Sequence, residues 1–188
     1  IDLSKVEYYH HVRGMLAGEQ MIISHTGYTG EPGFELYFSA DPTVGQKVWR
    51  TIFEAGREFG IMPVGLGARD TLRLEMGFCL YGNDIDQSTN PLEAGLGWIT
   101  RFDKGDFAGR PVLVKAKQEG VKRKLCGFTL PDRTLARHGY MISSNGSAAG
   151  QVTSGTFSPS LQKGIGMGYV RAELAKPGEI VNVEIRGK

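Results

Sequence analysis

The sequence has few of the residues from which metal and disulfide sites are built. Its 188 residues include two cysteines and four histidines, and neither type occurs at CxxC, HxxxH or HxxE spacing. Cys79 and Cys126 stand among apolar residues, so we expect two reduced, packed thiols in a reducing compartment. We assign no metal ligands.

Long apolar runs and an excess of one charge are also missing. No run reaches the ~18 apolar residues of a membrane span, and the N-terminus lacks the basic and apolar stretches of a secretion signal. Lys and Arg number 22 against 20 Asp and Glu, a net charge of +2 that is spread along the chain. The densest basic run, 122–124, is typical of a linker or a strand edge. We therefore expect a soluble protein that binds neither nucleic acid nor a membrane.

The chain has no initiating methionine and ends in a strand-like segment, so we interpret it as a piece of a longer protein. Hydrophobic residues make up 40% of it, which is enough for the core of one large domain or two small ones.

The glycine-rich loop at 25–33 lies between two predicted strands, 20–24 and 34–38. Alternation along the second strand places Glu35 and Leu36 on opposite faces. The sequence therefore predicts a β-loop-β unit with a carboxylate just beyond the loop.

A helix is predicted at 42–59, with Asp41 as its N-cap and Gly60 as its end. We assign Trp49 to the core and not to a cofactor site, because its spacing is that of an apolar stripe. The stripe consists of Val44, Val48, Trp49, Ile52 and Phe53.

Charged residues stand among glycines and apolar residues in 64–86. Arg69 and Arg73 lie one turn apart on a predicted helix, with two acidic residues close enough to pair with them, Asp70 and Glu75. The loop at 81–86 then holds an aromatic residue and two carboxylates. A salt-bridged helix and a binding site both explain this pattern, and the pattern alone leaves both open.

The last third changes character after a second predicted helix at 107–120. Short strands replace helical periodicity, with an Asn145-Gly146 turn, and predict a small β-barrel or sandwich. We expect glycine-rich stretches 155–159 and 164–168 to supply turns and close strand packing. The expected strands are 124–130, 140–143, 150–153, 165–170 and 180–188.

Five motifs occur in an order that closely resembles the aminomethyltransferase, or T-protein, family of the glycine cleavage system. The similarity covers essentially all 188 residues, whereas family chains are about twice as long. It implies an α+β fold, with residues 1–120 as the latter part of a folate-binding domain and 121–188 as a small C-terminal β-barrel, incomplete at its end. The motifs are Gly27-Tyr-Thr-Gly-Glu-Pro-Gly-Phe-Glu35, Gly65-Leu-Gly-Ala-Arg-Asp-Thr-Leu-Arg-Leu-Glu75, Leu80-Tyr-Gly-Asn-Asp-Ile-Asp86, Asn90-Pro-Leu-Glu93 and Val152-Thr-Ser-Gly155.

The resemblance implies an enzyme that takes an aminomethyl group from the lipoyl arm of the H-protein. Its one-carbon unit passes to tetrahydrofolate, and ammonia and 5,10-methylenetetrahydrofolate are released. The expected location is the cytoplasm, or the mitochondrial matrix in a eukaryote. The family's catalytic aspartate lies in the portion that precedes this sequence. We therefore name no catalytic residue and expect the 188 residues alone to be inactive.

Three residues match family positions that bind tetrahydrofolate. Glu35 matches the carboxylate that accepts the neighbouring donors of the pterin, Arg69 matches a folate-contacting arginine, and Tyr28 resembles an aromatic residue beside the pocket. On its residues alone, Glu35 could be an exposed strand carboxylate and Tyr28 an edge plug. We interpret Arg73 as structural, and weaker candidates for shaping the loop are Tyr81, Asp84 and Asp86.

Two other functions share this fold. One is the folate module of a dimethylglycine- or sarcosine-oxidising enzyme, which is fused to a flavoprotein. The other is a folate-binding accessory protein of iron–sulfur cluster repair, which binds without transfer. The complete motifs at 65–75 and 80–86 argue against the accessory protein.

Overall fold

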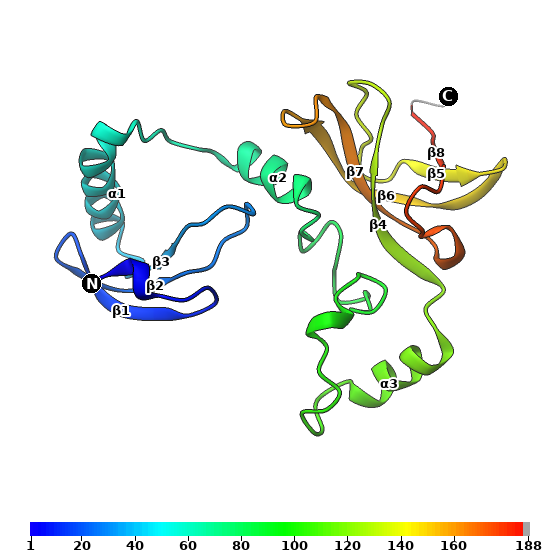
Figure 1. Cartoon of the computed structure of the whole chain (residues 1–188), viewed down its shortest axis with the longest axis horizontal. Helices are drawn as coiled ribbons and strands as arrows, with labels where there is room; N and C mark the ends of the chain where they lie inside the picture. The colour runs from blue at the N-terminus through cyan, green and yellow to red at the C-terminus, as the bar shows by residue number, and fades with distance from the viewer. Residues whose placement is uncertain (186–188) are drawn as a thin grey trace. The chain divides into compact units, whose positions relative to one another are not determined.

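The structure is a computed structural model that describes residues 1–185 (Figure 1). Its helices and strands form an α+β fold, as predicted. Two compact units, Ile1–Leu72 and Arg73–Lys188, each contain an apolar core. The domain boundary expected near residue 120 stays a prediction. Within the described residues, no helix has the length and apolar character needed to cross a membrane.

The first unit is built on a three-stranded antiparallel sheet in the order β1-β2-β3. The strands are β1 (His11–Leu16), β2 (Glu19–Ser24) and β3 (Glu35–Tyr37). The two predicted strands are confirmed as β2 and β3, but the sequence does not predict β1. Arg13 and Gly14 interrupt the apolar alternation by which a strand is recognised.

Helix α1 (Pro42–Gly56) packs against one face of this sheet (Figure 1). Asp41 caps it as predicted, accepting a hydrogen bond from the Thr43 N–H at 2.8 Å. A 3₁₀ turn, Arg57–Phe59, continues to Gly60, whose φ of 71° ends the helical segment. The core between helix and sheet is formed by Met21, Ile23 and Val48, with Val12, Leu16, Leu36, Val44 and Ile52 packed around them.

The assignment of Trp49 to the core is wrong. Its side chain is 56% exposed and lies beside Phe53, with 4.5 Å between the ring centroids. The buried stripe runs through Val44, Val48 and Ile52, four residues apart each time, and Trp49 lies about 100° around the helix from Val48.

The second unit contains a five-stranded antiparallel sheet in the order β4-β7-β6-β5-β8. Its core is formed by Ala136, Ile142, Ala149, Val152 and Val170. The closing strand is described at β8, and residues 186–188 of its predicted range lie outside the described residues. The strands are β4 (Arg123–Thr129), β5 (Met141–Ser144), β6 (Ser147–Ser158), β7 (Lys163–Arg171) and β8 (Asn182–Val183).

The hairpin between β5 and β6 turns at Asn145 and Gly146, as predicted. Both residues have positive φ, 51° and 74°, the conformation that two-residue hairpin turns require. The turn expected at 155–159 is wrong in its first part, because β6 continues to Ser158. The expected close packing is confirmed at Gly155, where a Cβ would lie 2.1 Å from the carbonyl oxygen of Ala136.

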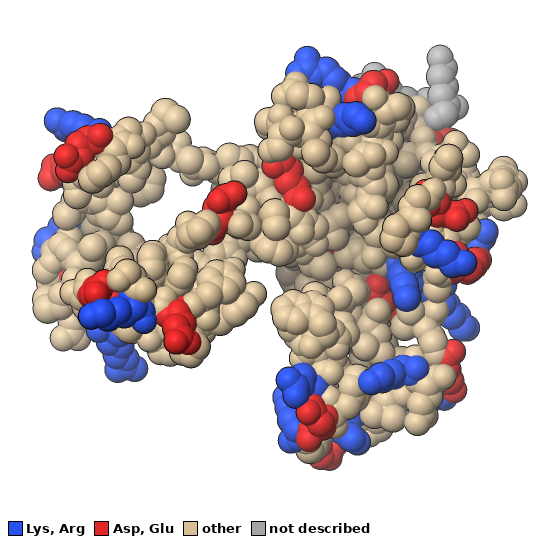
Figure 2. Space-filling view, viewed as in Figure 1, with Lys and Arg blue, Asp and Glu red and all other residues tan. Residues whose placement is uncertain are grey.

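Helices α2 (Leu66–Glu75) and α3 (Arg110–Glu119) complete the described helices, with 3₁₀ turns at Leu3–Lys5, Gly97–Ile99 and Ala172–Leu174. Both α-helices match predictions, and Gly120 follows the last residue of α3. The boundary between the two units falls within α2, after Leu72. Basic and acidic residues are interspersed on the face that Figure 2 shows.

Candidate functional site

The glycine-rich loop between β2 and β3 brings two of the three predicted site residues together. The guanidinium carbon of Arg69, on the first half of α2, lies 4.5 Å from the centre of the Tyr28 ring. This is the distance of a cation–π contact. Tyr28 is half-buried and Arg69 is exposed, so the edge of the guanidinium remains accessible while the ring supports its face.

Glu35, the third predicted residue, begins β3 beyond the same loop. The Thr26 hydroxyl donates to its Oε2 at 2.5 Å, and the Tyr37 hydroxyl donates to the same oxygen at 3.4 Å. Oε1 receives no hydrogen bond from residues 1–185. The carboxylate is therefore held in place through one oxygen and presents the other.

Thr26 and Tyr37, which hold Glu35, are site residues that the sequence analysis missed. The signal was the period of two along each strand, which places Tyr37 on the same face as Glu35. Ser24 is the cross-strand partner of Glu35, and Thr26 donates to the Ser24 hydroxyl at 3.0 Å as well. A short row of hydroxyl groups thus surrounds the carboxylate.

The start of the loop is fixed by His25. Its Nδ1 forms a hydrogen bond of 2.6 Å with the carbonyl oxygen of Val6, so Nδ1 carries the proton and donates. The ring stacks on Phe34, with 4.8 Å between centroids, and the edge of Tyr8 packs against it. These contacts join both ends of the loop to the N-terminal segment and give Glu35 a defined position.

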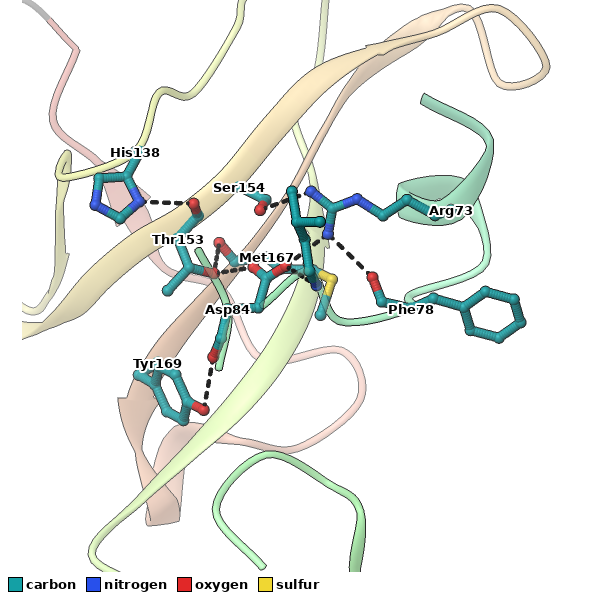
Figure 3. Close-up of polar contacts among 9 residues, drawn as sticks. Arg73, Phe78, Asp84, His138, Thr153, Ser154, Met167 and Tyr169 are labelled. Carbon is teal, nitrogen blue, oxygen red and sulfur yellow. Dashed lines mark hydrogen bonds and ion pairs between the residues drawn. The ribbon is translucent and has the colours of Figure 1, made fainter. Parts of the chain in front are cut away.

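The second half of α2 belongs to a different polar cluster, which is buried in the second unit (Figure 3). Arg73 is 1% exposed. Its Nη1 donates to Asp84 Oδ2 at 2.5 Å and to the Phe78 carbonyl at 3.0 Å, and its Nη2 donates to Ser154 Oγ at 2.9 Å. This geometry agrees with the interpretation of Arg73 as structural.

Asp84 accepts hydrogen bonds on both of its carboxylate oxygens. Thr153 Oγ1 donates to Oδ1 at 2.5 Å, and the Leu80 N–H donates to Oδ2 at 2.9 Å. The Tyr169 hydroxyl donates to the Asp84 carbonyl oxygen at 2.9 Å, and burial raises the pKa of Tyr169 to about 12. Asp84 thus shapes the 80–86 loop from within, as expected for the weaker candidates.

The other acidic residues of this region make local contacts. Glu75, predicted to pair with an arginine of α2, accepts hydrogen bonds from the hydroxyls of Ser158 at 2.5 Å and Ser160 at 2.8 Å. Asp86 accepts from the N–H and hydroxyl of Ser88 at 2.8 and 2.7 Å. Tyr81 is 70% exposed.

The cysteines are packed, as expected. Cys79 lies against the cluster of Leu74, Ile165 and Met167, and Cys126 packs on the core around Ile142 and Val152. Burial raises the pKa of both thiols, so both stay protonated and weakly nucleophilic at neutral pH.

Comparisons with known proteins match both parts of the chain. The family model described as GCVT N-terminal domain matches residues 1–104, and the one described as glycine cleavage T-protein C-terminal barrel domain matches residues 123–188. The aminomethyltransferase of Halothermothrix orenii is 54% identical over 188 residues, which are 100% of this chain and 52% of the relative. That of Bacteroides thetaiotaomicron is 58% identical over 191 residues, with the same coverage.

A solved structure has the same fold. The crystal structure of glycine cleavage system aminomethyltransferase T from Bartonella henselae matches with a TM-score of 0.85 and 33% identity, over 98% of this chain and 50% of that one. The chain therefore spans about half the length of the relatives it matches. Its family follows from the two matched domain families together with these identities: the chain belongs to the aminomethyltransferase family of glycine cleavage T-proteins.

Proposed function

We propose that this chain provides the tetrahydrofolate-binding residues of a glycine cleavage aminomethyltransferase. In this reaction the aminomethyl group carried by the lipoyl arm of the H-protein gives its one-carbon unit to tetrahydrofolate, and ammonia is released. The observation that supports the proposal most directly is the Glu35 carboxylate, which Thr26 and Tyr37 hold through Oε2.

The hydrogen-bonding capacity of Glu35 fits a pterin. The reduced pterin presents a ring N–H and an amino group side by side, and an ionised carboxylate offers about four acceptor positions. Two of these are used, both on Oε2, and the one from Tyr37 is long at 3.4 Å. Bidentate acceptance therefore uses Oε1 fully and requires only the Tyr37 contact to yield.

Arg69 fits the same cofactor through its fixed fork of donors. Its guanidinium lies over the Tyr28 ring, so the plane is oriented before a ligand arrives. We propose that the accessible N–H groups donate to an oxygen of tetrahydrofolate and that Tyr28 flanks the pocket. When bound, tetrahydrofolate supplies the amine nitrogen that accepts the one-carbon unit.

No residue of this chain is proposed as catalytic. Glu35 and Arg69 bind and orient in this proposal, and the 188 residues alone are expected to give no transfer. We also propose a division into a folate-binding part, residues 1–120, and a barrel, residues 121–188. The barrel would supply the rigid support to which the second half of α2 is anchored.

The test is calorimetric titration of tetrahydrofolate into the longest natural form of this chain. H-protein carrying the aminomethyl-lipoyl group is added afterwards while ammonia is measured. Binding followed by ammonia release supports the transferase. Binding without release would favour the folate module of a dimethylglycine- or sarcosine-oxidising enzyme or the iron–sulfur repair accessory protein. No binding would reject the folate proposal altogether.

A further inference from the structure

The outer face of the three-stranded sheet, opposite α1, carries a hollow of about 550 Å³. Its lining includes Arg13 and Gln20 together with the apolar or aromatic side chains of Ile22, Tyr37 and Phe38. The volume falls within the range of about 300–1,000 Å³ that small-molecule sites occupy. All of these residues belong to the first unit.

The strand register places Glu35 at one corner of this face. Ser24 pairs with Glu35, and Ile22, two residues earlier, pairs with both Tyr37 and Arg13. Side chains two residues apart share a face, so Glu35, Tyr37 and Arg13 all project to the outer side. Tyr37 joins the hollow to the site, because it lines the hollow and its hydroxyl donates to Glu35.

Arg13 and Glu35 are separated by two strands and two residues along the sheet. With strands about 4.8 Å apart and a rise of about 3.4 Å per residue, their Cα atoms lie about 12 Å from one another. The long arginine side chain extends the reach of its charge further. The two ends of the face are thus too far apart to pair and far enough apart for a ligand to lie between them.

Arg13 is exposed, and its guanidinium makes no ion pair or hydrogen bond with residues 1–185. By contrast, Lys47 of the same unit pairs with Glu19 at 2.7 Å. The outer face therefore runs from an acceptor at Glu35, across apolar and aromatic side chains, to an unpaired cation at Arg13.

We propose that Arg13 binds the glutamyl carboxylates of a folate whose pterin lies at Glu35. This rests on the proposed function. Tetrahydrofolate carries its donor pair at one end, an aromatic aminobenzoyl ring in the middle and carboxylates at the other end, the same order of chemistry as this face. The guanidinium fork accommodates a carboxylate with two parallel hydrogen bonds, and Gln20, beside it, is a further donor.

The test compares two ligands that differ only in the glutamyl group, tetrahydrofolate and tetrahydropteroate, by calorimetry on the longest natural form of the chain. Wild type should bind tetrahydrofolate about tenfold more tightly. Arg13→Ala should remove this difference and leave the affinity for tetrahydropteroate unchanged, and Arg13→Lys should retain part of it. Arg50→Ala, which removes an exposed cation of α1, is the matched control and should behave as wild type.

The outcomes separate this inference from the proposed function. If wild type binds both ligands equally, the Arg13 assignment is overturned while folate binding stands. If Arg69→Ala removes the difference and Arg13→Ala preserves it, the glutamyl group lies at Arg69 and the assignment is again wrong. If wild type binds neither ligand, the folate proposal itself fails and Arg13 has no role in it.

Discussion

Two arginines on α2, one turn apart, have opposite surroundings. Arg69 is exposed and rests on the Tyr28 ring, whereas Arg73 is buried and donates to Asp84, Ser154 and the Phe78 carbonyl. Their charges are the same, and the difference lies in how many donors are already used. An arginine with accessible donors is suited to bind a ligand, and one whose donors are used inside the protein holds the fold together.

The carboxylates of the two regions differ in the same way. Asp84 accepts hydrogen bonds on both oxygens from residues of the second unit. Glu35 accepts on one oxygen, and both donors are hydroxyl groups of its own unit. Charge alone therefore does not identify the candidate site. The distinguishing property is an ionised group that is held in position and still has hydrogen-bonding capacity.

The largest effect should come from breaking the buried cluster. Arg73→Ala leaves Asp84 as an uncompensated buried charge, and removing one partner of such a pair costs about 3–5 kcal/mol of folding free energy. Denaturant unfolding followed by circular dichroism measures the loss. Arg69→Ala is the matched control, and since Arg69 is exposed it should change stability by less than about 1 kcal/mol. Equal stability of the two variants would show that the distinction between the arginines is wrong.

Glu35→Ala tests the other side of the comparison and should affect binding without affecting the fold. Loss of a charged acceptor should weaken tetrahydrofolate binding by ~1.5–3 kcal/mol, measured by calorimetry on the longest natural form of the chain. The unfolding midpoint should stay near that of wild type. An unchanged dissociation constant would remove Glu35 from the pocket. Glu35→Gln, which keeps one acceptor oxygen, should give an intermediate loss.

Arg69→Lys sharpens the contrast within α2, because it keeps the charge and removes the planar fork. An ammonium group cannot donate two parallel hydrogen bonds or stack on Tyr28 as a guanidinium does. We expect a weakening of tetrahydrofolate binding by about 1 kcal/mol. Isotherms that superimpose on those of wild type would show that Arg69, like Arg73, is structural.

Local features of the fold could be predicted from the sequence because their causes are local. Asp41 before Pro42 marks the start of α1, and the Asn145-Gly146 turn follows from two positive φ angles. The face of Glu35 follows from strand alternation. By contrast, Trp49 fits an apolar stripe in the sequence, and only the packed helix shows that the stripe is narrower.

Partners distant in the sequence could not be predicted. Arg73 meets Asp84, 11 residues away, and Ser154, 81 residues away. In the sequence, Asp70 and Glu75 are the nearer acids, and nothing in the spacing indicates that Glu75 meets serines more than 80 residues away. Such pairings depend on how strands β6 and β7 fold back, which a periodicity of side chains does not encode.

The smallest predicted effect concerns pH and Glu75, which lies between the two kinds of carboxylate. Hydrogen bonds from Ser158 and Ser160 lower the pKa of Glu75 despite its partial burial. A lowered pKa means that the folded state favours the ionised form. The contribution is therefore fully present above the unfolded-state pKa of about 4.3 and is lost as pH falls through the folded-state value. We expect Glu75→Gln to cost less than about 1 kcal/mol at pH 7.

Unfolding measured from pH 7 to pH 3 should therefore bring the Glu75→Gln variant and wild type together in acid. Asp41→Asn, at the N-cap of α1, is the matched control because its carboxylate also accepts from a hydroxyl and an N–H but lies in the first unit. If the Glu75→Gln and wild-type curves stay parallel throughout, Glu75 does not titrate differently in the folded state. It would then resemble an exposed carboxylate, and ionisation would add nothing to the serine contacts that hold the end of α2.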